Sequence, residues 1–462
     1  MNVDAMSPVY LGRLPSLSVL LGLSVDPLAT TRRLHSAHGP YVVLNLPHSR
    51  RSRPQILGCI ADAELYRTMF SSPDAWRGVN VGMRAFKNHA LNRLNLSMTR
   101  LRGARHAHYR RLLSPPLSKP AVAAMSPAMA AMAQAHVLSW PRGTAIDLLR
   151  LTEHLMQGLA IGLLFGDDQE RAQPIARMIA RLAAAAWPFP GRAYLTALRT
   201  APKLERAILQ WADEKRGELN PKDILSILVN NPDERGAPPS RELIEGILTF
   251  SFGAAYETCQ NALVWTLIVL TQHPLVAAQL AEEIDGAVHG GPPAMDRIGH
   301  LPLLDGVVKE GMRLFPPVPL QFRRSVIATN LGDARIPAGV RVLASAYLIN
   351  RNPNIYDEPY RFRPERWRDL EPSPYDYPVF GAGGRMCPGF MFGNQMVKIA
   401  LAAILSAHRV ELVPGARIDH RATITLSPYP AVPIILRDKT NAPIATPLTG
   451  RIRELIDLPL ST

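Results

Sequence analysis

Cysteine is scarce in this chain of 462 residues, which contains only Cys59, Cys259 and Cys387. An odd number of widely spaced cysteines argues against a disulfide framework and is typical of a reducing compartment, so we expect a cytoplasmic protein. A hydrophobic core must then stabilise the fold. Hydrophobic residues make up 47% of the chain, which is ample for a large core.

A long apolar run is lacking at the N-terminus. The apolar stretch 14–25 has 12 residues and contains Pro15, whereas a membrane span needs about 20. Asp4 lies where an export signal would carry basic residues. We therefore expect no stable membrane anchor, although this stretch is apolar enough to touch a membrane surface.

Acidic residues are too few to balance the basic ones, with 38 against 52 and a net charge of +14. Such an excess is often a sign of nucleic-acid binding. Here, however, the arginines are spread along the chain, with no lysine-rich tail and no basic module interleaved with aromatic residues. We therefore expect no nucleic-acid partner.

Helical patterning dominates residues 61–313, where long Ala-, Leu- and Met-rich stretches occur. The longest predicted helix covers residues 241–272 and follows Ser240, a plausible N-cap, with Glu242 in its first turn. At 1.5 Å per residue it would be roughly 48 Å long. Because it is apolar almost throughout, we expect it to cross the molecular core.

Strand signals lie at the two ends of this helical region. Residues 41–46 and 55–60 predict two strands of a small sheet. After Phe315 the pattern changes to short strands and proline-rich turns. Residues 423–426 and 432–436 predict two closing strands joined by a turn at 427–430. The chain is thus expected to be mainly α with small β-sheets.

One cysteine lies in a glycine-rich loop directly before a predicted helix at 390–408. Residues 380–389 read Phe-Gly-Ala-Gly-Gly-Arg-Met-Cys-Pro-Gly. A helix N-terminus and the neighbouring Arg385 supply positive potential, and Gly389 lets backbone amides approach the sulfur, which favours a thiolate. The pattern Phe-x-x-Gly-x-Arg-x-Cys-x-Gly would arise by chance about once in 10⁴ chains of this length. The alternative is a buried structural cysteine in a turn.

This loop resembles the haem-binding signature of the cytochrome P450 family, the haem-thiolate monooxygenases. The resemblance implies haem b as the cofactor, with Cys387 as the proximal ligand of the iron and Phe380 and Arg385 in the same loop. It also implies a single-domain P450 fold, with the haem between the long central helix and the helix after the cysteine loop.

The resemblance implies further groups for the two haem propionates, which arginine forks suit well. His106 and Arg110 match the family's helix with His or Trp four residues before Arg. Arg323 lies on the family's strand after the Glu-x-x-Arg helix. Its neighbour Arg324 is an alternative, because the sequence does not fix the register.

On the long helix, residues 254–258 read Ala-Ala-Tyr-Glu-Thr and resemble the family's oxygen-activation segment. In that segment an alcohol hydrogen-bonds dioxygen and an acid relays protons, which implicates Thr258 and Glu257 in catalysis. Ala255 stands where the family usually has glycine. A polar pair satisfied within a core helix is the alternative interpretation.

The family's structural Glu–Arg–Arg triad is matched by Glu310, Arg313 and Arg366. Glu310 and Arg313 share one helix face at i, i+3, and Arg366 lies in the segment Phe-Arg-Pro-Glu-Arg-Trp that begins at residue 362. A buried charge network of this kind supports the core and takes no part in the chemistry.

The resemblance implies a monooxygenase domain at 38–438, with an N-terminal lead-in at 1–37 and a C-terminal extension at 439–462. The expected reaction inserts one oxygen atom of O₂ into a hydrophobic small molecule, such as a terpenoid, a polyketide or a fatty-acid derivative. An acidic ferredoxin with an NAD(P)H-dependent reductase would supply electrons, and the basic surface suits such a partner. Peroxide-driven, dehydration or isomerisation chemistry is the alternative.

Overall fold

The computed structural model describes residues 7–44, 57–79, 85, 89–94, 97–184, 192–439 and 444–459. The α-helices are α1 (Arg13–Val25), α2 (Pro27–His38), α3 (Ala63–Ser71), α4 (Ala90–Leu94), α5 (Gly103–Leu112), α6 (Lys119–Leu138), α7 (Leu148–Phe165), α8 (Gln169–Ala184), α9 (Arg192–Glu214), α10 (Ile224–Asn230), α11 (Arg241–Thr271), α12 (Pro274–Val288), α13 (Met295–Ile298), α14 (Pro302–Leu314), α15 (Ala346–Ile349) and α16 (Phe390–Ala407).

The strands are β1 (Val9–Leu11), β2 (Tyr41–Leu44), β3 (Leu57–Ile60), β4 (Trp76–Gly78), β5 (Ala145–Asp147), β6 (Leu320–Ser325), β7 (Thr329–Leu331), β8 (Ala334–Ile336), β9 (Arg341–Ser345), β10 (Arg409–Leu412), β11 (Asp419–Ala422), β12 (Leu426–Tyr429) and β13 (Pro433–Arg437). Short 3₁₀ turns are η1 (Pro115–Leu117), η2 (Pro364–Arg368), η3 (Pro378–Phe380), η4 (Gly383–Arg385) and η5 (Arg451–Glu454).

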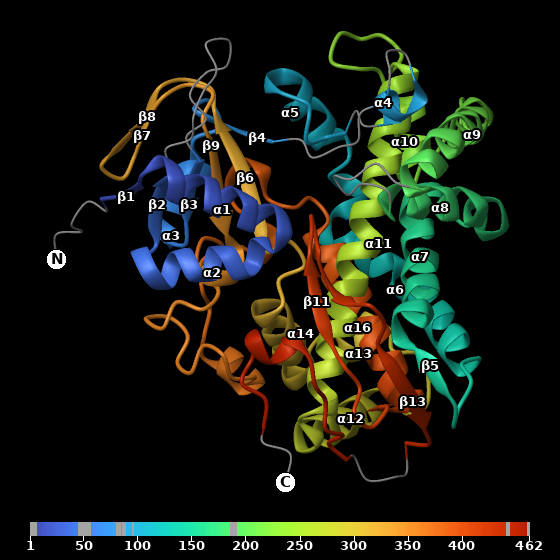
Figure 1. The fold of residues 1–462 in the computed structure, drawn as a ribbon. Coiled ribbons are helices and arrows are strands. Elements are labelled where there is room, and N and C mark those ends of the chain that lie inside the picture. The colour runs from blue at the N-terminus through green and yellow to red at the C-terminus, as the bar shows by residue number, and fades with distance from the viewer. Residues whose placement is uncertain are drawn as a thin grey trace.

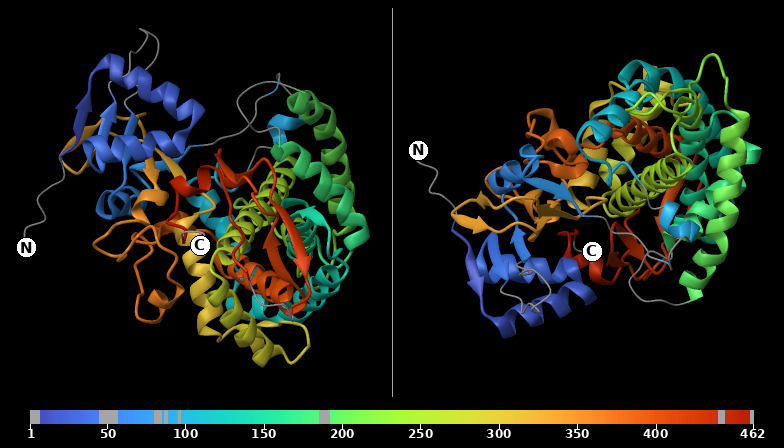
Figure 2. Two further views of the ribbon diagram at one scale, coloured as in Figure 1. Left: turned by 60° about the horizontal axis from the view of Figure 1, so that its bottom comes forward. Right: turned by 90° about the horizontal axis from the view of Figure 1, so that it is seen from above.

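The molecule has a sheet-rich side and a larger helical body (Figures 1 and 2). The largest sheet has the strand order β1-β2-β3-β9-β6-β4. Within it, β2 and β3 pair antiparallel, with Tyr41 opposite Ile60, as the sequence predicts for the parts of 41–46 and 55–60 that are described. The mainly α fold with small sheets is thereby confirmed.

Both ends of the chain pack against its main body. Residues 9–11 form β1, which pairs parallel with β2, and Arg451 forms an ion pair with Asp26 at the start of α2. Leu455 near the C-terminus is fully buried, and its carbonyl accepts a hydrogen bond of 2.9 Å from Arg351. The lead-in and the C-terminal extension therefore contact each other.

The long central helix has nearly the predicted bounds and runs through the helical body as α11 (Figure 1). Ser240 is its N-cap residue, but the hydroxyl makes no capping hydrogen bond. The helix is buried along 243–248 and 259–271, whereas Phe250 between these stretches is 43% exposed. The middle of this core helix is therefore partly exposed.

The prediction for the closing strands is partly wrong. Residues 423–425 form the turn between β11 and β12, and the expected turn at 427–430 lies mostly in β12. The β-branched residues of 423–425 mimic a strand, and Pro428 is tolerated in β12 because this strand belongs to a two-stranded sheet with free edges. Strand β13 pairs instead with β10 and β5.

Among the residues that the structure describes, two helices, α6 and α16, are long and apolar enough to cross a membrane by length and composition alone. The apolar pair α11 and α12 meets the same test together but is bent by 118°. Two-thirds of the most apolar window of α16 is buried within the protein, compared with one-third for α6. The absence of a membrane anchor stays a prediction.

Candidate active site

The cysteine loop is shaped by its own backbone. The amide of Cys387 donates to the carbonyl of Phe380 at 2.8 Å, and the amide of Met386 donates to Gly383 at 3.0 Å. Gly383 has φ +63°, and a Cβ there would lie 2.3 Å from the carbonyl oxygen of Phe70. Glycine is therefore required at this position, and the loop presents Cys387 at the start of α16.

Opposing effects act on the Cys387 thiol. Burial raises its pKa, while a hydrogen bond from the Gly389 amide and the charge of Arg110 lower it. The predicted amide contact is present, but the protein alone leaves the pKa above its ordinary value. Burial raises the pKa of both Cys59 and Cys259 to about 12, so these two remain thiols.

Cationic side chains gather around this loop. Arg110 on α5 donates to the carbonyl of Met386 at 2.7 Å, and Arg385 donates to the carbonyl of Leu101 at 2.9 Å. His106 lies close enough to be affected by both charges, since burial, Arg385 and Arg110 together lower its pKa to about 4. The structure thus brings together three of the side chains that the resemblance implicates.

Arg323 joins the same cluster, whereas Arg324 does not. Burial and then the charge of Arg385 lower the pKa of Arg323 to about 10, and its guanidinium lies 4.0 Å from the centre of the Phe70 ring. Arg324, on the other face of β6, instead acts on the pKa of Arg77. Of the two alternatives, Arg323 is the one that faces the cysteine loop.

These cations fit a dianionic cofactor edge. Within the described parts of the chain, no carboxylate lies within ion-pair distance of Arg110, Arg323 or Arg385. Three partly buried arginines close to one another repel unless an anion joins them. Two carboxylates of a bound haem would supply that anion, so the donor set suits the cofactor that the resemblance implies.

The other wall of the site is the exposed part of α11. Ala254 and Phe250 lie one turn apart on this helix and are both exposed. The Thr258 hydroxyl donates to the carbonyl of Ala254 at 2.7 Å. With its proton committed to the backbone, this oxygen presents its lone pairs outward. The helix is continuous past Ala255.

Close helix packing joins this wall to the cysteine loop. The sulfur of Cys259, next to Thr258, lies 3.7 Å from the carbonyl oxygen of Gly393 in the second turn of α16. A Cβ at Gly393 would lie 3.3 Å from the same sulfur. The charge of Cys387 contributes to the raised pKa of Cys259. The two predicted halves of the site are therefore adjacent.

Glu257 and Thr258 have different hydrogen-bond partners. Oε1 of Glu257 accepts a hydrogen bond of 2.7 Å from the Thr425 hydroxyl in the turn before β12. Burial raises the pKa of Glu257, while Thr425 and Arg421 oppose this and Glu153 adds to it. Thr425 was not predictable as a partner of Glu257, because the two residues are 168 positions apart and no local pattern connects them.

A second acidic residue of α11 was also missed. Glu245 is only 1% exposed, and burial and the nearby Glu205 raise its pKa to about 8. Glu205 on α9 accepts two hydrogen bonds, of 2.5 and 2.8 Å, from Arg93 on α4. This cluster ties α4 and α9 to the central helix. The position of Glu245 within an apolar stretch of the sequence was the signal that could have indicated a buried acid.

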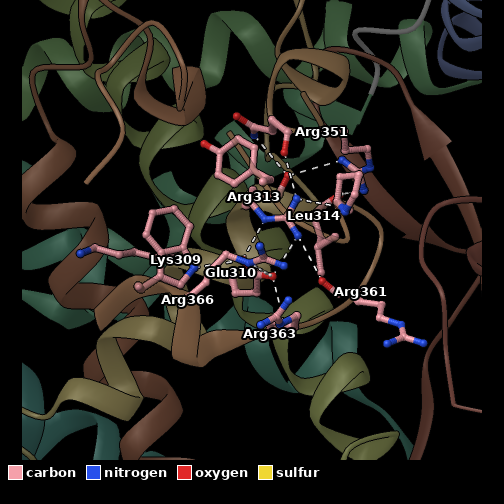
Figure 3. A network of polar contacts seen from close by, with 12 residues as sticks. Lys309, Glu310, Arg313, Leu314, Arg351, Arg361, Arg363 and Arg366 are labelled. Atoms are coloured by element: carbon pink, nitrogen blue, oxygen red, sulfur yellow. Dashed lines mark hydrogen bonds and ion pairs between the residues drawn. The ribbon is translucent and has the colours of Figure 1, made fainter. Parts of the chain in front are cut away.

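Behind the site, the predicted triad is formed (Figure 3). Glu310 and Arg313 are joined by two hydrogen bonds of 2.8 and 2.9 Å, and both are fully buried. Arg366 reaches Glu310 at 3.1 Å, and Trp367 donates to it at 2.9 Å. Arg313 also donates to the carbonyls of Asn350, Pro359 and Arg361. The contacts expected within the triad are thereby confirmed.

Solved structures share the fold of this chain. The chain superposes on a retinoic-acid-bound cyanobacterial CYP120A1 with a TM-score of 0.76 and 19% identity, over 90% of this chain and 96% of the other. For a cytochrome P450DA haem domain the TM-score is 0.77 at 20% identity, over 94% and 98% of the two chains. These likenesses show the fold.

Among curated relatives, the cyclooctat-9-en-7-ol 5-monooxygenase of Streptomyces melanosporofaciens is 28% identical over 88% of this chain and 90% of its own. The pentalenene oxygenase of Streptomyces avermitilis is 31% identical over 46% and 48% of the two chains. The family model for cytochrome P450 matches residues 78–432, which include the cysteine loop, the cationic cluster and the exposed part of α11. Because this match covers most of the chain, which also has the fold of the solved structures above, the chain belongs to the cytochrome P450 family.

Proposed function

We propose that this P450 monooxygenase inserts one oxygen atom of O₂ into a terpenoid hydrocarbon or alcohol, with electrons from a separate ferredoxin and its NAD(P)H-dependent reductase. The observation that carries the proposal is the placement of Cys387 opposite the exposed part of α11, within a ring of arginines that lack a carboxylate partner in the described structure. We propose the cytoplasm as the compartment in which this enzyme acts.

Haem b, when bound, supplies the reductive activation of dioxygen. Cys387 would ligate its iron, and His106, Arg110, Arg323 and Arg385 would hold its propionates, with Phe380 in the same loop. The overall reaction consumes O₂, two electrons and two protons, and yields the hydroxylated product and water. The chain must therefore deliver two protons, and Glu257 and Thr258 are the groups proposed to do so.

A terpenoid substrate is supported by the relatives and by the lining of the site. The names of two relatives specify cyclooctat-9-en-7-ol and pentalenene. Besides Phe250, the exposed apolar side chains Ile424 and Tyr429 lie in and beside the turn that contacts Glu257. Binding of either compound should displace water and shift the haem spin state, which an absorption titration measures. If polyketides or fatty acids shift the spin state and these terpenoids do not, the proposed substrate class is wrong.

Thr258→Ala is expected to leave haem and substrate binding intact but to divert reducing equivalents to hydrogen peroxide or water. The lost bond to the Ala254 carbonyl lies within one turn of the helix, so we expect folding to be preserved. General acid–base groups contribute factors of about 10²–10⁴, although water replaces part of this. The measurement is product formed per NAD(P)H consumed, with Thr258→Ser as the variant that retains a hydroxyl. Equal coupling in all three proteins would remove Thr258 from the relay.

Peroxide-driven, dehydration or isomerisation chemistry is distinguished by its need for electrons. If product forms from hydrogen peroxide, or without any co-substrate, at the rate seen with the complete redox chain, the monooxygenase assignment to this substrate fails. A strict requirement for O₂ and NAD(P)H supports it.

The proposed electron donor is an acidic ferredoxin that docks near α5. Arg111 on α5 is exposed and has no ion-pair partner in the described chain, and Arg102 before the helix is also exposed. Arg105 on the same helix is ion-paired with Glu234 at 3.4 Å. The proposed docking surface therefore centres on Arg102 and Arg111.

Raising the ionic strength is expected to slow ferredoxin-dependent reduction much more than it weakens binding of a neutral substrate. Electrostatic steering is screened over about 8 Å at physiological salt. Arg111→Glu should reproduce part of this slowing at low salt, as measured by stopped-flow reduction. Arg150→Glu is the matched control, because Arg150 is also exposed but lies on α7 beside β5, away from α5 in Figure 1. Reduction rates indifferent to salt and to both reversals would exclude this surface as the docking site.

A further inference from the structure

The carboxyl of Glu257 is held by a segment distant in sequence. The Thr425 hydroxyl donates to Glu257 Oε1 at 2.7 Å, across a separation of 168 residues. Thr425 is only 5% exposed, so water competes poorly for this bond. Thr425 belongs to the turn that joins β11 and β12, and β12 contacts α11.

Hydrogen bonds of the neighbouring backbone fix the position of the turn that carries Thr425. The amide of Leu426 donates to the carbonyl of Pro317 at 3.0 Å. The carbonyl of Leu426 accepts a hydrogen bond of 3.0 Å from the indole of Trp265, which lies two turns after Glu257 on the same helix. Within the turn, the Thr423 amide donates to the carbonyl of Thr425 at 3.0 Å. Thr425 is therefore anchored to the helix that carries the acid.

Charged groups from two other elements face the same carboxyl. Arg421 on β11 favours its ionised form, and Glu153 on α7 disfavours it. Arg421 lies 5.2 Å from the centre of the Tyr429 ring, and Glu153 accepts a hydrogen bond of 3.1 Å from Gln157. A cation and an anion thus act on the acid in opposite directions. Among the described residues, the neutral donor Thr425 is its one hydrogen-bond partner.

We propose that Thr425 is a positioning residue of the proton relay, which holds the Glu257 carboxyl beside the site and sets how readily it gives up a proton. This rests on the proposed role of Glu257. A hydroxyl that donates to a carboxylate oxygen stabilises the ionised acid and fixes its orientation. Without it, the carboxyl gains rotational freedom, and the proton is held more tightly.

The first test needs no turnover. In the resting holoenzyme, pH-difference infrared spectra report the titration of buried carboxyls, and the band absent from Glu257→Gln belongs to Glu257. In Thr425→Val this titration should move to higher pH, because the hydrogen bond that lowers the pKa is lost. Thr425→Ser should restore it. Thr423→Val, in the same turn, is the matched control and should not move it. An unmoved band in Thr425→Val would overturn the proposal.

The second test is a double-mutant cycle that measures coupling, the product formed per NAD(P)H consumed. The substrate probe is cyclooctat-9-en-7-ol or pentalenene. NAD(P)H oxidation without added substrate is subtracted for every variant. Thr425→Val should lower the fraction of electrons used to form product by about 2- to 10-fold, which is the range that the loss of one hydrogen bond corresponds to. In the Glu257→Gln background it should add nothing. An additive effect would mean that Thr425 acts elsewhere. If Glu257→Gln alone changes nothing, the relay role fails, while the infrared titration still decides whether Thr425 holds the acid.

Discussion

Cys387→Ala is expected to abolish the absorption band characteristic of thiolate-ligated haem in the reduced, CO-bound protein. Within the described structure, Cys387 is the cysteine that lies in the glycine loop, beside the Gly389 amide and Arg110. Cys59 and Cys259 are buried thiols with pKa values of about 12. Neither can replace the missing ligand without leaving its packing, so the loss should be complete.

Two controls separate ligation from folding. Cys59→Ala and Cys259→Ala should retain the thiolate spectrum, since the first residue lies in β3 and the second packs its sulfur against the Gly393 carbonyl. Circular dichroism of Cys387→Ala should remain helical, because the loop backbone is held by bonds that do not use the sulfur, such as that from the Cys387 amide to Phe380. A thiolate spectrum that survives in folded Cys387→Ala would overturn the assignment.

The cysteine loop was predictable because its determinants are consecutive in sequence. Gly383 has a φ of +63°, which favours glycine, and the amide of Gly389 reaches Cys387 two residues away. Helix α16 follows from its apolar run alone. The same holds for Glu310 and Arg313, which meet because residues three apart share a helix face.

Contacts between distant segments were not predictable. Thr425 reaches Glu257 only because β11 and β12 fold back along α11. The residues of this turn, Thr423, Ile424 and Thr425, have β-branched side chains that are typical of strands, so sequence patterning assigned the turn to a strand. The backbone geometry of the turn, with the Thr423 amide bonded to the carbonyl of Thr425, has no signature in residue type.

The choice between Arg323 and Arg324 illustrates the same limit. Adjacent residues on a strand point to opposite faces, so a shift of register by one residue exchanges their roles. The pairing of β6 with β9 and β4 decides the register. A sequence without its partner strands carries no such information.

Glu310→Ala is expected to destabilise the protein by about 3–5 kcal/mol, a large share of the roughly 5–15 kcal/mol that stabilises most domains. The substitution leaves the buried guanidinium of Arg313 and the nearly buried one of Arg366 without their carboxylate. It also removes the acceptor of the Trp367 indole. Urea unfolding followed by circular dichroism measures the loss, which should be accompanied by poor haem incorporation on expression.

The neighbouring pair provides the matched control. Lys309 forms an ion pair with Asp305 at 2.7 Å, but both side chains are about one-third exposed, so Lys309→Ala should cost no more than about 1 kcal/mol. Arg313→Lys should resemble Glu310→Ala more than this control, because one ammonium group cannot reproduce a planar fork that also serves the carbonyls of Asn350 and Pro359. Equal losses of stability in Lys309→Ala and Glu310→Ala would contradict this expectation. The buried triad would then contribute no more to the free energy of unfolding than an exposed ion pair does.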